Sequence, residues 1–175
     1  MRILVLNGPN LNLLGNRQPE VYGSESLEDL DRAVTGWGQT LGIEVSSVQA
    51  NSEAALIDAI HNSSDDGIVI NPGAFSHTSR AIADALASVA RPTVEVHISN
   101  IKDRENWRAE SMIAEVADYT IYGRGFDGYR AALRFLVNRA TVGYQKISYG
   151  PHPEQYGHYR DGEGSLAILI HGGIW

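Results

Sequence analysis

The sequence predicts an α/β fold in which helices cover both faces of a five-stranded parallel sheet. The candidate strands are short and mostly apolar throughout, as in strands that are buried on both faces. Each is followed by a segment with helical periodicity, so strands and helices alternate along the chain. The length of 175 residues, with 43% hydrophobic and 20% charged residues, suits one globular domain. For such a chain, right-handed crossovers and the flavodoxin-like strand order 2-1-3-4-5 are the natural topology.

The five predicted strands differ in their patterns. Residues 2–6 and 67–71 are continuous apolar runs, which favours central positions in the sheet. Residues 43–48 alternate between polar and apolar side chains, as a half-exposed strand does. The remaining strands are predicted at 92–98 and 119–122.

The predicted helices begin at residues that can cap an N-terminus. Ser24 and Ser26 precede a helix over about 27–41, whose apolar residues share one face, and Gly42 ends it. The other helices are predicted after Ser52, over about 78–89, over about 104–114 and after Asp127.

Composition excludes several classes of function. The net charge is −7 and the basic residues are scattered, so the footprint of a nucleic-acid-binding protein is missing. The two lysines, Lys102 and Lys146, do not lie in apolar runs, which disfavours Schiff-base chemistry. There is no cysteine, and neither a signal peptide nor a membrane span is indicated, so we expect a cytoplasmic protein. No Walker motif or metal-spaced histidine pair occurs.

In doubly wound sheets, ligands bind beyond the carboxyl ends of the strands, where the strand order reverses. The loop after the first strand is much longer than the usual two to six residues and contains Asn10, Arg17 and Tyr22. Gly15 and Gly23 could act as hinges, so we interpret the loop as an active-site lid. The Arg17 charge could make the Tyr22 phenol ionisable. The alternative is that Tyr22 only packs and Arg17 is solvated.

The loop after the third strand contains Asn71 and His77. Ser76 or Thr78 can cap the next helix, whose amino end favours an anion. His77 lies beside that end and could bind a hydroxyl or carboxylate group. Alternatively, Asn71 and His77 only satisfy the backbone of the turn.

The fourth strand contains the strongest signal for chemistry. Glu95 and His97 are two positions apart and therefore share a face of the sheet. A carboxylate next to an imidazole fixes its tautomer and favours its protonated form, which suits a general acid. Burial of both groups is costly unless they are paired or used. A purely structural pair is the alternative.

Two further patterns are ambiguous. Arg104 and Arg108 lie one helical turn apart; they form a solvated helix face, or they clamp a carboxylate or gate the lid. Residues 123–128 match GxGxxG, but a dinucleotide site needs a further strand–helix unit. We interpret this motif as a tight turn that lets the last helix pack closely.

Several long motifs occur together in a fixed order. They are Leu-Asn-Gly-Pro-Asn-Leu-Asn-Leu-Leu-Gly at 6–15, Arg-Gln-Pro-Glu-Val-Tyr-Gly at 17–23, Asn-Ser-Glu at 51–53, Asn-Pro-Gly-Ala-Phe-Ser-His-Thr-Ser at 71–79, and Glu-Val-His-Ile-Ser-Asn at 95–100, followed by Arg104 and Arg108. With these motifs, residues 1 to about 140 resemble the type II 3-dehydroquinases (3-dehydroquinate dehydratases). The resemblance implies a flavodoxin-like fold, a dodecamer built as a tetramer of trimers, and no metal or organic cofactor. It also implies anti elimination of water from 3-dehydroquinate, through an enolate, to give 3-dehydroshikimate.

The resemblance also implies roles for individual residues. Tyr22 would take the C2 proton, assisted by Arg17. His97, oriented by Glu95, would protonate the departing hydroxyl, and Asn10 would help hold a water that stabilises the enolate. The residues implied in substrate binding are Asn71, His77, Ile98, Ser99, Arg104, Arg108 and, across a trimer interface, Asp84.

The sequence departs from the family pattern late in the chain. Residues 118–122 are Asp-Tyr-Thr-Ile-Tyr, where the family usually has a glycine and small aliphatic residues, and Glu110 replaces a usual histidine. We expect a domain over 1–143 and an extension over 144–175, which adds an edge strand or stays mobile. The extension ends in His-Gly-Gly-Ile-Trp, which resembles the oxyanion loop of α/β-hydrolases, but there is no GxSxG nucleophile motif.

Two alternatives to a dehydratase stay open at this point. One is a flavodoxin-like module that binds a nucleotide or another anion at the same loops without catalysis. The other is an inactive fusion fragment whose tail blocks assembly.

Overall fold

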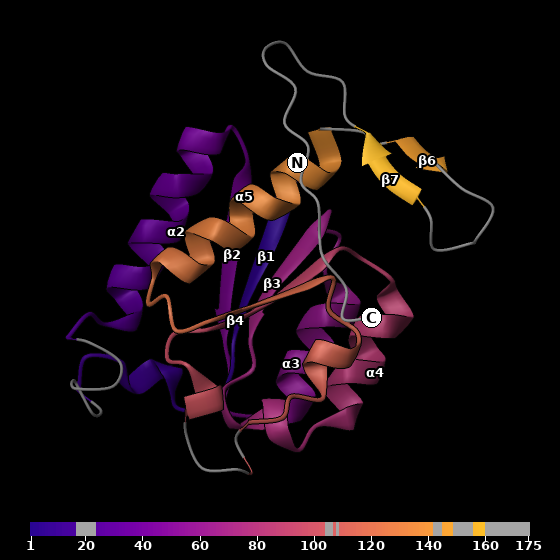
Figure 1. The fold of residues 1–175 in the computed structure, drawn as a ribbon. Helices are drawn as coiled ribbons and strands as arrows, with labels where there is room; N and C mark the ends of the chain where they lie inside the picture. The colour runs from indigo at the N-terminus through magenta and orange to yellow at the C-terminus, as the bar shows by residue number, and fades with distance from the viewer. Residues whose placement is uncertain (17–23, 104–106, 108, 142–144, 149–155, 160–175) are drawn as a thin grey trace. The chain divides into compact units, whose positions relative to one another are not determined.

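The structure, a computed structural model, describes residues 1–16, 24–103, 107, 109–141, 145–148 and 156–159 (Figure 1). Its main sheet is parallel, with strand order β2-β1-β3-β4-β5, which confirms the predicted flavodoxin-like fold. The strands are β1 (Arg2–Asn7), β2 (Glu44–Gln49), β3 (Gly67–Asn71), β4 (Thr93–His97) and β5 (Tyr119–Tyr122). The α-helices are α2 (Leu27–Leu41), α3 (Glu53–Asn62), α4 (Arg80–Val89) and α5 (Asp127–Thr141).

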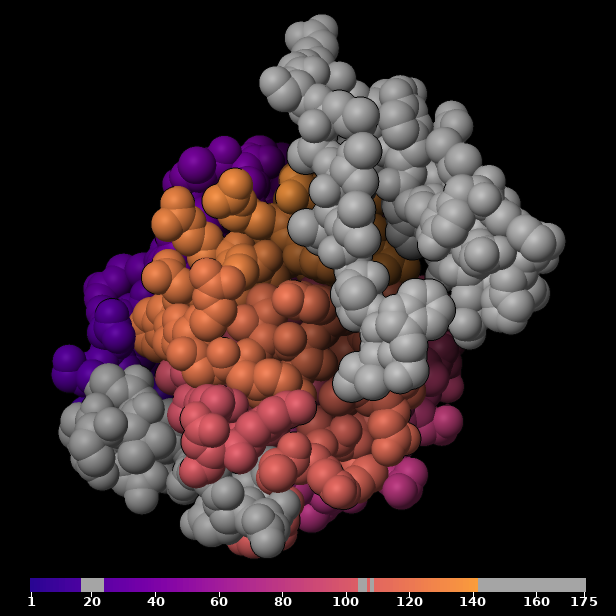
Figure 2. Space-filling view, in the orientation of Figure 1, coloured from indigo at the N-terminus to yellow at the C-terminus, as the bar shows by residue number. Residues whose placement is uncertain are grey.

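Helices cover both faces of the sheet, as predicted. Helices α2 and α5 lie on one side and α3 and α4 on the other (Figure 1). The alternation of side chains along β1 divides the core accordingly: Ile3 and Val5 face α2 and α5, whereas Leu4 and Leu6 face α3 and α4. The side chains of the edge strand β5 and of α5 form one face of the molecule (Figure 2).

The predicted start and end of α2 are confirmed. Ser26 accepts a hydrogen bond from the Asp29 amide, and the Asp29 carboxylate accepts one from the Ser26 amide, which forms a capping box. These hydrogen bonds hold the pKa of Asp29 below its ordinary value. At the other end, Gly42 adopts a left-handed conformation (φ 68°) that few other residues tolerate.

Two predicted helices differ from the observed elements. The helix predicted over 78–89 begins at Arg80 and is capped by Ser79, because a 3₁₀ helix, η2 (Gly73–His77), occupies the preceding turn. Neither Ser76 nor Thr78 therefore caps α4.

The helix predicted over 104–114 is wrong at residues 109–112; residues 104–106 and 108 lie outside the described residues. Residues 109–112 are not helical, and the described 3₁₀ turns near them are η3 (Ile101–Asp103) and η5 (Ile113–Glu115). The physical reason is that Ser111 and Met112 form hydrogen bonds with distant elements, β4 and η2. The Met112 amide donates to the Ser76 carbonyl, and the Ser111 hydroxyl donates to Glu95.

The GxGxxG segment acts as a tight turn, as interpreted from the sequence. Gly123 and Gly125 have positive φ angles of 67° and 53°. A Cβ atom on Gly128 would lie 3.1 Å from Cγ1 of Val96, so glycine lets α5 approach the sheet closely.

The chain divides into two compact units, Met1–Asn138 and Arg139–Trp175. In the second unit, β6 (Gln145–Ser148) and β7 (Tyr156–Tyr159) pair antiparallel in a sheet of their own. Residues 165–175, for which a hydrolase-like ending was noted, lie outside the described residues. Within the described part of the chain, every helix is too short or too polar to cross a membrane.

Candidate active site

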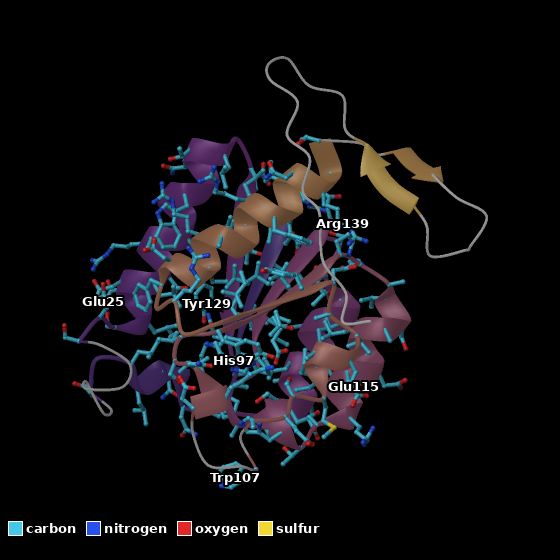
Figure 3. The ribbon with its side chains drawn as sticks, viewed as in Figure 1. Glu25, His97, Trp107, Glu115, Tyr129 and Arg139 are labelled. Carbon is cyan, nitrogen blue, oxygen red and sulfur yellow. The ribbon has the colours of Figure 1, made fainter. Side chains whose placement is uncertain are left out.

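The carboxyl ends of β1, β3 and β4 lie at one edge of the sheet and bring most of the predicted site residues together (Figures 1 and 3). These residues are Asn10, Asn71, His77, Glu95, His97, Ile98 and Ser99. Asp84 lies instead on the exposed side of α4. Arg17, Tyr22, Arg104 and Arg108 were also predicted to belong to the site, and they lie outside the described residues.

The predicted pairing of Glu95 with His97 is confirmed. Both side chains are buried, with exposed fractions of 0% and 4%, and Oε1 of Glu95 lies 2.8 Å from Nε2 of His97. The Ser111 hydroxyl donates to the same carboxylate oxygen at 2.5 Å. Such contacts offset the large cost of burying a charged group. Because Glu95 engages Nε2, a protonated imidazole keeps a second N–H group, on Nδ1, as a potential proton donor.

Strand β5 adds two side chains to this pair. The Tyr122 ring stacks on the His97 ring with a centroid distance of 5.4 Å and an interplanar angle of 16°. The Thr120 hydroxyl donates to Oε2 of Glu95 at 3.4 Å. Burial, followed by the nearby Glu95 charge, raises the pKa of Tyr122, so its phenol is neutral at physiological pH. We call these five residues, Glu95, His97, Ser111, Thr120 and Tyr122, the acid cluster.

A second buried polar network joins β1, β3 and α5. The Tyr129 hydroxyl donates to Oδ1 of Asn7 at 2.8 Å and accepts from Nδ2 of Asn71 at 2.9 Å (Tyr129 is labelled in Figure 3). Oδ1 of Asn71 in turn accepts from the Gly73 amide at 3.2 Å. Burial strongly raises the pKa of Tyr129, so its hydroxyl stays neutral and can donate and accept together. We call Asn7, Asn71 and Tyr129 the amide relay; it fixes the direction of the Asn71 carboxamide.

The loops after β1 and β3 touch each other. The Gly8 amide donates to the Asn71 carbonyl at 2.7 Å, and a Cβ atom on Gly8 would lie 2.3 Å from the Pro72 carbonyl oxygen. Only glycine therefore permits this approach. Two residues further on, Asn10 adopts a left-handed conformation (φ 67°), and its amide donates to Oδ1 of Asn51. These contacts hold Asn10 at the edge of the site.

His77 bridges η2 and the segment that follows β4. Its Nδ1 lies 2.7 Å from the Glu110 carbonyl oxygen, so Nδ1 carries the proton in the neutral ring. The ring also meets Trp107 edge to face at 5.4 Å. His77 thus contacts the backbone of a distant segment, not that of its own turn, and it stays partly exposed at the site edge.

Sequence reasoning missed four residues of the two networks as functional candidates: Ser111, Thr120, Tyr122 and Asn7. It placed Tyr129 only in the core. Thr120 and Tyr122 could have been found, because they alternate on β5 in step with Glu95 and His97 on β4. Asn7 carried a weaker signal, as a polar residue at the end of an apolar strand.

A metal centre is not indicated. In the part of the chain that the structure describes, no group of three or more histidine or acidic side chains is arranged to hold a metal ion.

The fold and the site define a flavodoxin-like α/β domain with a buried carboxylate–imidazole pair at the carboxyl end of its sheet, an arrangement typical of general acid catalysis. The family model for class II dehydroquinases matches residues 1–137. The chain belongs to this family.

Named relatives agree with this assignment. 3-Dehydroquinate dehydratase 2 of Corynebacterium efficiens is 52% identical over 143 residues, which cover 79% of this chain and 99% of that protein. The catabolic 3-dehydroquinase of Pyricularia oryzae is 49% identical, covering 78% of this chain and 90% of the relative. The crystal structure of type II dehydroquinase from Propionibacterium acnes has a TM-score of 0.76 and 45% identity, covering 78% and 96% of the two chains.

Proposed function

We propose that this protein is a type II 3-dehydroquinate dehydratase. Family membership supports the substrate and the reaction. The relatives named for this activity align with this chain over 90% or more of their own length. Within the structure, the observation that carries the proposal is the buried Glu95–His97 pair at the carboxyl end of β4. The reaction serves the shikimate pathway or quinate breakdown, because both use the same step.

The proposed reaction breaks two bonds and forms one double bond. Tyr22, assisted by Arg17, takes a proton from C2 of 3-dehydroquinate, and the electron pair is delocalised into the C3 carbonyl as an enolate. The enolate then collapses to a C1–C2 double bond and expels the C1 hydroxyl. His97 donates a proton to that hydroxyl, which leaves as water.

The elimination needs a base and an acid on opposite sides of one small ligand. The geometry of β4 supports His97 as the acid, because the buried Glu95 carboxylate holds one nitrogen of the imidazole at the carboxyl end of the strand. In the proposal, Asn10 helps hold a water near the enolate. The proposed substrate-binding residues are Asn71, His77, Ile98, Ser99, Arg104 and Arg108.

The test is to mix the protein with 3-dehydroquinate and follow the ultraviolet absorbance of the conjugated enone product. We expect turnover without added metal or organic cofactor. Absence of product at high enzyme concentration would reject the proposal. Tyr22→Phe removes the base and should lower kcat by about 10²–10⁴-fold while the fold persists. A near-normal kcat would show that another group takes the C2 proton.

The family resemblance further leads us to propose a dodecamer, a tetramer of trimers, in the cytoplasm. The exposed position of Asp84 on α4 is compatible with its reaching the site of a neighbouring subunit. Analytical ultracentrifugation measures the assembly directly, and a monomer would contradict it. We also propose that residues 1–143 form the catalytic domain and 144–175 an extension, since the family match stops at residue 137. Limited proteolysis with mass spectrometry tests this boundary.

A further inference from the structure

Two residues of β5 lie directly beside the Glu95–His97 pair. In the parallel register, Glu95 is opposite Thr120 and His97 is opposite Tyr122. Side chains opposite each other on one face of a sheet are close enough to interact. The pair on β4 therefore has a matching pair on β5.

The contacts between the two pairs are specific. The ring planes of Tyr122 and His97 differ by only 16°, so the imidazole lies almost flat against the phenol. Thr120 links the two pairs through the contact of its hydroxyl with Oε2 of Glu95. Tyr122 is partly buried and hence held in place by its surroundings.

A third element contacts the Tyr122 ring. Nζ of Lys102, in η3, lies 5.2 Å from the ring centroid, within the range of cation–π attraction. Two charged groups therefore face the Tyr122–His97 stack from described elements, Glu95 from β4 and Lys102 from η3. Lys102 follows His97 by only five positions, so this contact ties the loop after β4 to β5.

We propose that Tyr122, supported by Thr120, is a positioning residue that fixes the plane of the His97 imidazole for proton donation. The proposal rests on the proposed function, in which His97 is the acid. An imidazole rotates freely about its terminal torsion unless its surroundings hold it. The Glu95 contact fixes Nε2, and the Tyr122 stack fixes the ring plane. Together they determine the direction in which Nδ1 points.

A misdirected Nδ1 would slow the second half of the reaction selectively. The C2 proton would still be removed, but the enolate would return to substrate more often before the C1 hydroxyl is protonated. In D₂O, substrate recovered from a partial reaction would then carry more deuterium at C2 per product formed. A merely structural role of Tyr122 would lower the amount of active enzyme without changing this ratio.

The experiment compares full-length wild type, Tyr122→Val, Tyr122→Phe and the matched control Tyr119→Val. Tyr119 is the same residue type on the opposite face of β5, where it stacks on Phe135 and is 53% exposed. We expect Tyr122→Val to lower kcat by roughly tenfold to a hundredfold with little change in KM, and to raise C2 deuteration per turnover. Tyr122→Phe, which keeps the ring, and Tyr119→Val should both stay within about threefold of wild type.

Several outcomes would overturn the inference. An unchanged kcat in Tyr122→Val would remove any role for the ring, and an unchanged deuteration ratio would leave only a structural role. An equal loss in Tyr122→Phe or in Tyr119→Val would show that the stack is not the cause. If Tyr122→Val does not fold, as judged by circular dichroism, the same comparisons apply to Tyr122→Leu, which keeps more of the volume. An inactive wild type would instead reject the proposed function.

Discussion

The acid cluster and the amide relay both lie at the carboxyl end of the sheet, but they differ in charge and in what they connect. The acid cluster contains ionisable groups and joins two adjacent strands to the segment before η5. The amide relay contains neutral groups and joins β1 and β3 to a helix far along the chain. A neutral network inside a core contributes mainly to shape, whereas a charged pair can exchange a proton. We therefore expect mutations in the acid cluster to affect turnover first and mutations in the relay to affect stability first.

The largest effect should come from the centre of the acid cluster. His97→Ala removes the proposed acid and should lower kcat by about 10²–10⁴-fold. The fold should persist, because Glu95 keeps its hydrogen bonds from Ser111 and Thr120. Steady-state kinetics and circular dichroism on the same preparation test both parts. A near-normal kcat would remove His97 from the mechanism.

The corresponding change in the amide relay should lower stability more than turnover. Tyr129→Phe leaves Oδ1 of Asn7 and Nδ2 of Asn71 buried without this partner and should cost about 2–4 kcal/mol of stability. Denaturant midpoints, measured at one protein concentration because assembly contributes, test this value. Turnover should fall less than in His97→Ala. The reverse ranking would contradict the division between the two networks.

The Tyr129 variant also gives a pH test. The raised pKa of Tyr129 in the folded protein means that above its ordinary value of 10.0 the unfolded chain ionises while the folded chain does not. The stability that Tyr129 provides is therefore complete below pH 10 and is lost as the pH rises towards the folded-state pKa. The difference in stability between wild type and Tyr129→Phe should shrink above pH 10. A constant difference would mean that Tyr129 is not buried as a neutral group.

A smaller effect should follow from neutralising the carboxylate of the acid cluster. Glu95→Gln keeps the shape of the side chain and some of its hydrogen bonds, but a neutral amide oxygen is a weaker hydrogen-bond partner for the imidazole than a carboxylate oxygen. We expect kcat to fall by roughly tenfold to a hundredfold, the equivalent of one charge-assisted hydrogen bond. Glu115→Gln, the same change on the exposed η5 turn, is the matched control and should leave kcat unchanged (Glu115 is labelled in Figure 3). If the two changes alter kcat equally, the charge of Glu95 has no specific role in catalysis.

Much of this arrangement could be predicted from sequence, because it depends on local patterns. Apolar or alternating patterns located all five strands of the main sheet, and the Ser26 and Ser52 caps located two helix starts. The pairing of Glu95 with His97 followed from their spacing on one strand. In each case the interacting residues are near neighbours in the sequence.

What could not be predicted depends on contacts between distant residues. Asn7 and Tyr129 are 122 positions apart, and no local sequence pattern predicts their hydrogen bond. Segment 104–114 was predicted to be a helix. In the structure, Ser111 donates to Glu95, 16 positions away, and Met112 donates to Ser76, so tertiary contacts take precedence over helix propensity here.

Ser111 therefore provides the test with the smallest expected effect, because its substitution removes one of the hydrogen bonds that fix Glu95 in the acid cluster. Its hydroxyl donates to Glu95 and also accepts from the amides of Ile113 and Ala114 at the start of η5. Ser111→Ala should cost about 1 kcal/mol of stability and lower kcat by about three- to tenfold, because the carboxylate keeps its His97 partner.

Ser47→Ala, an exposed serine on the edge strand β2, is the matched control for this change and should alter neither quantity. If Ser111→Ala lowers stability without lowering kcat, the hydroxyl supports the η5 turn alone. A loss in kcat that is additive with that of Glu95→Gln would also contradict the arrangement, because residues that act through one contact are not independent.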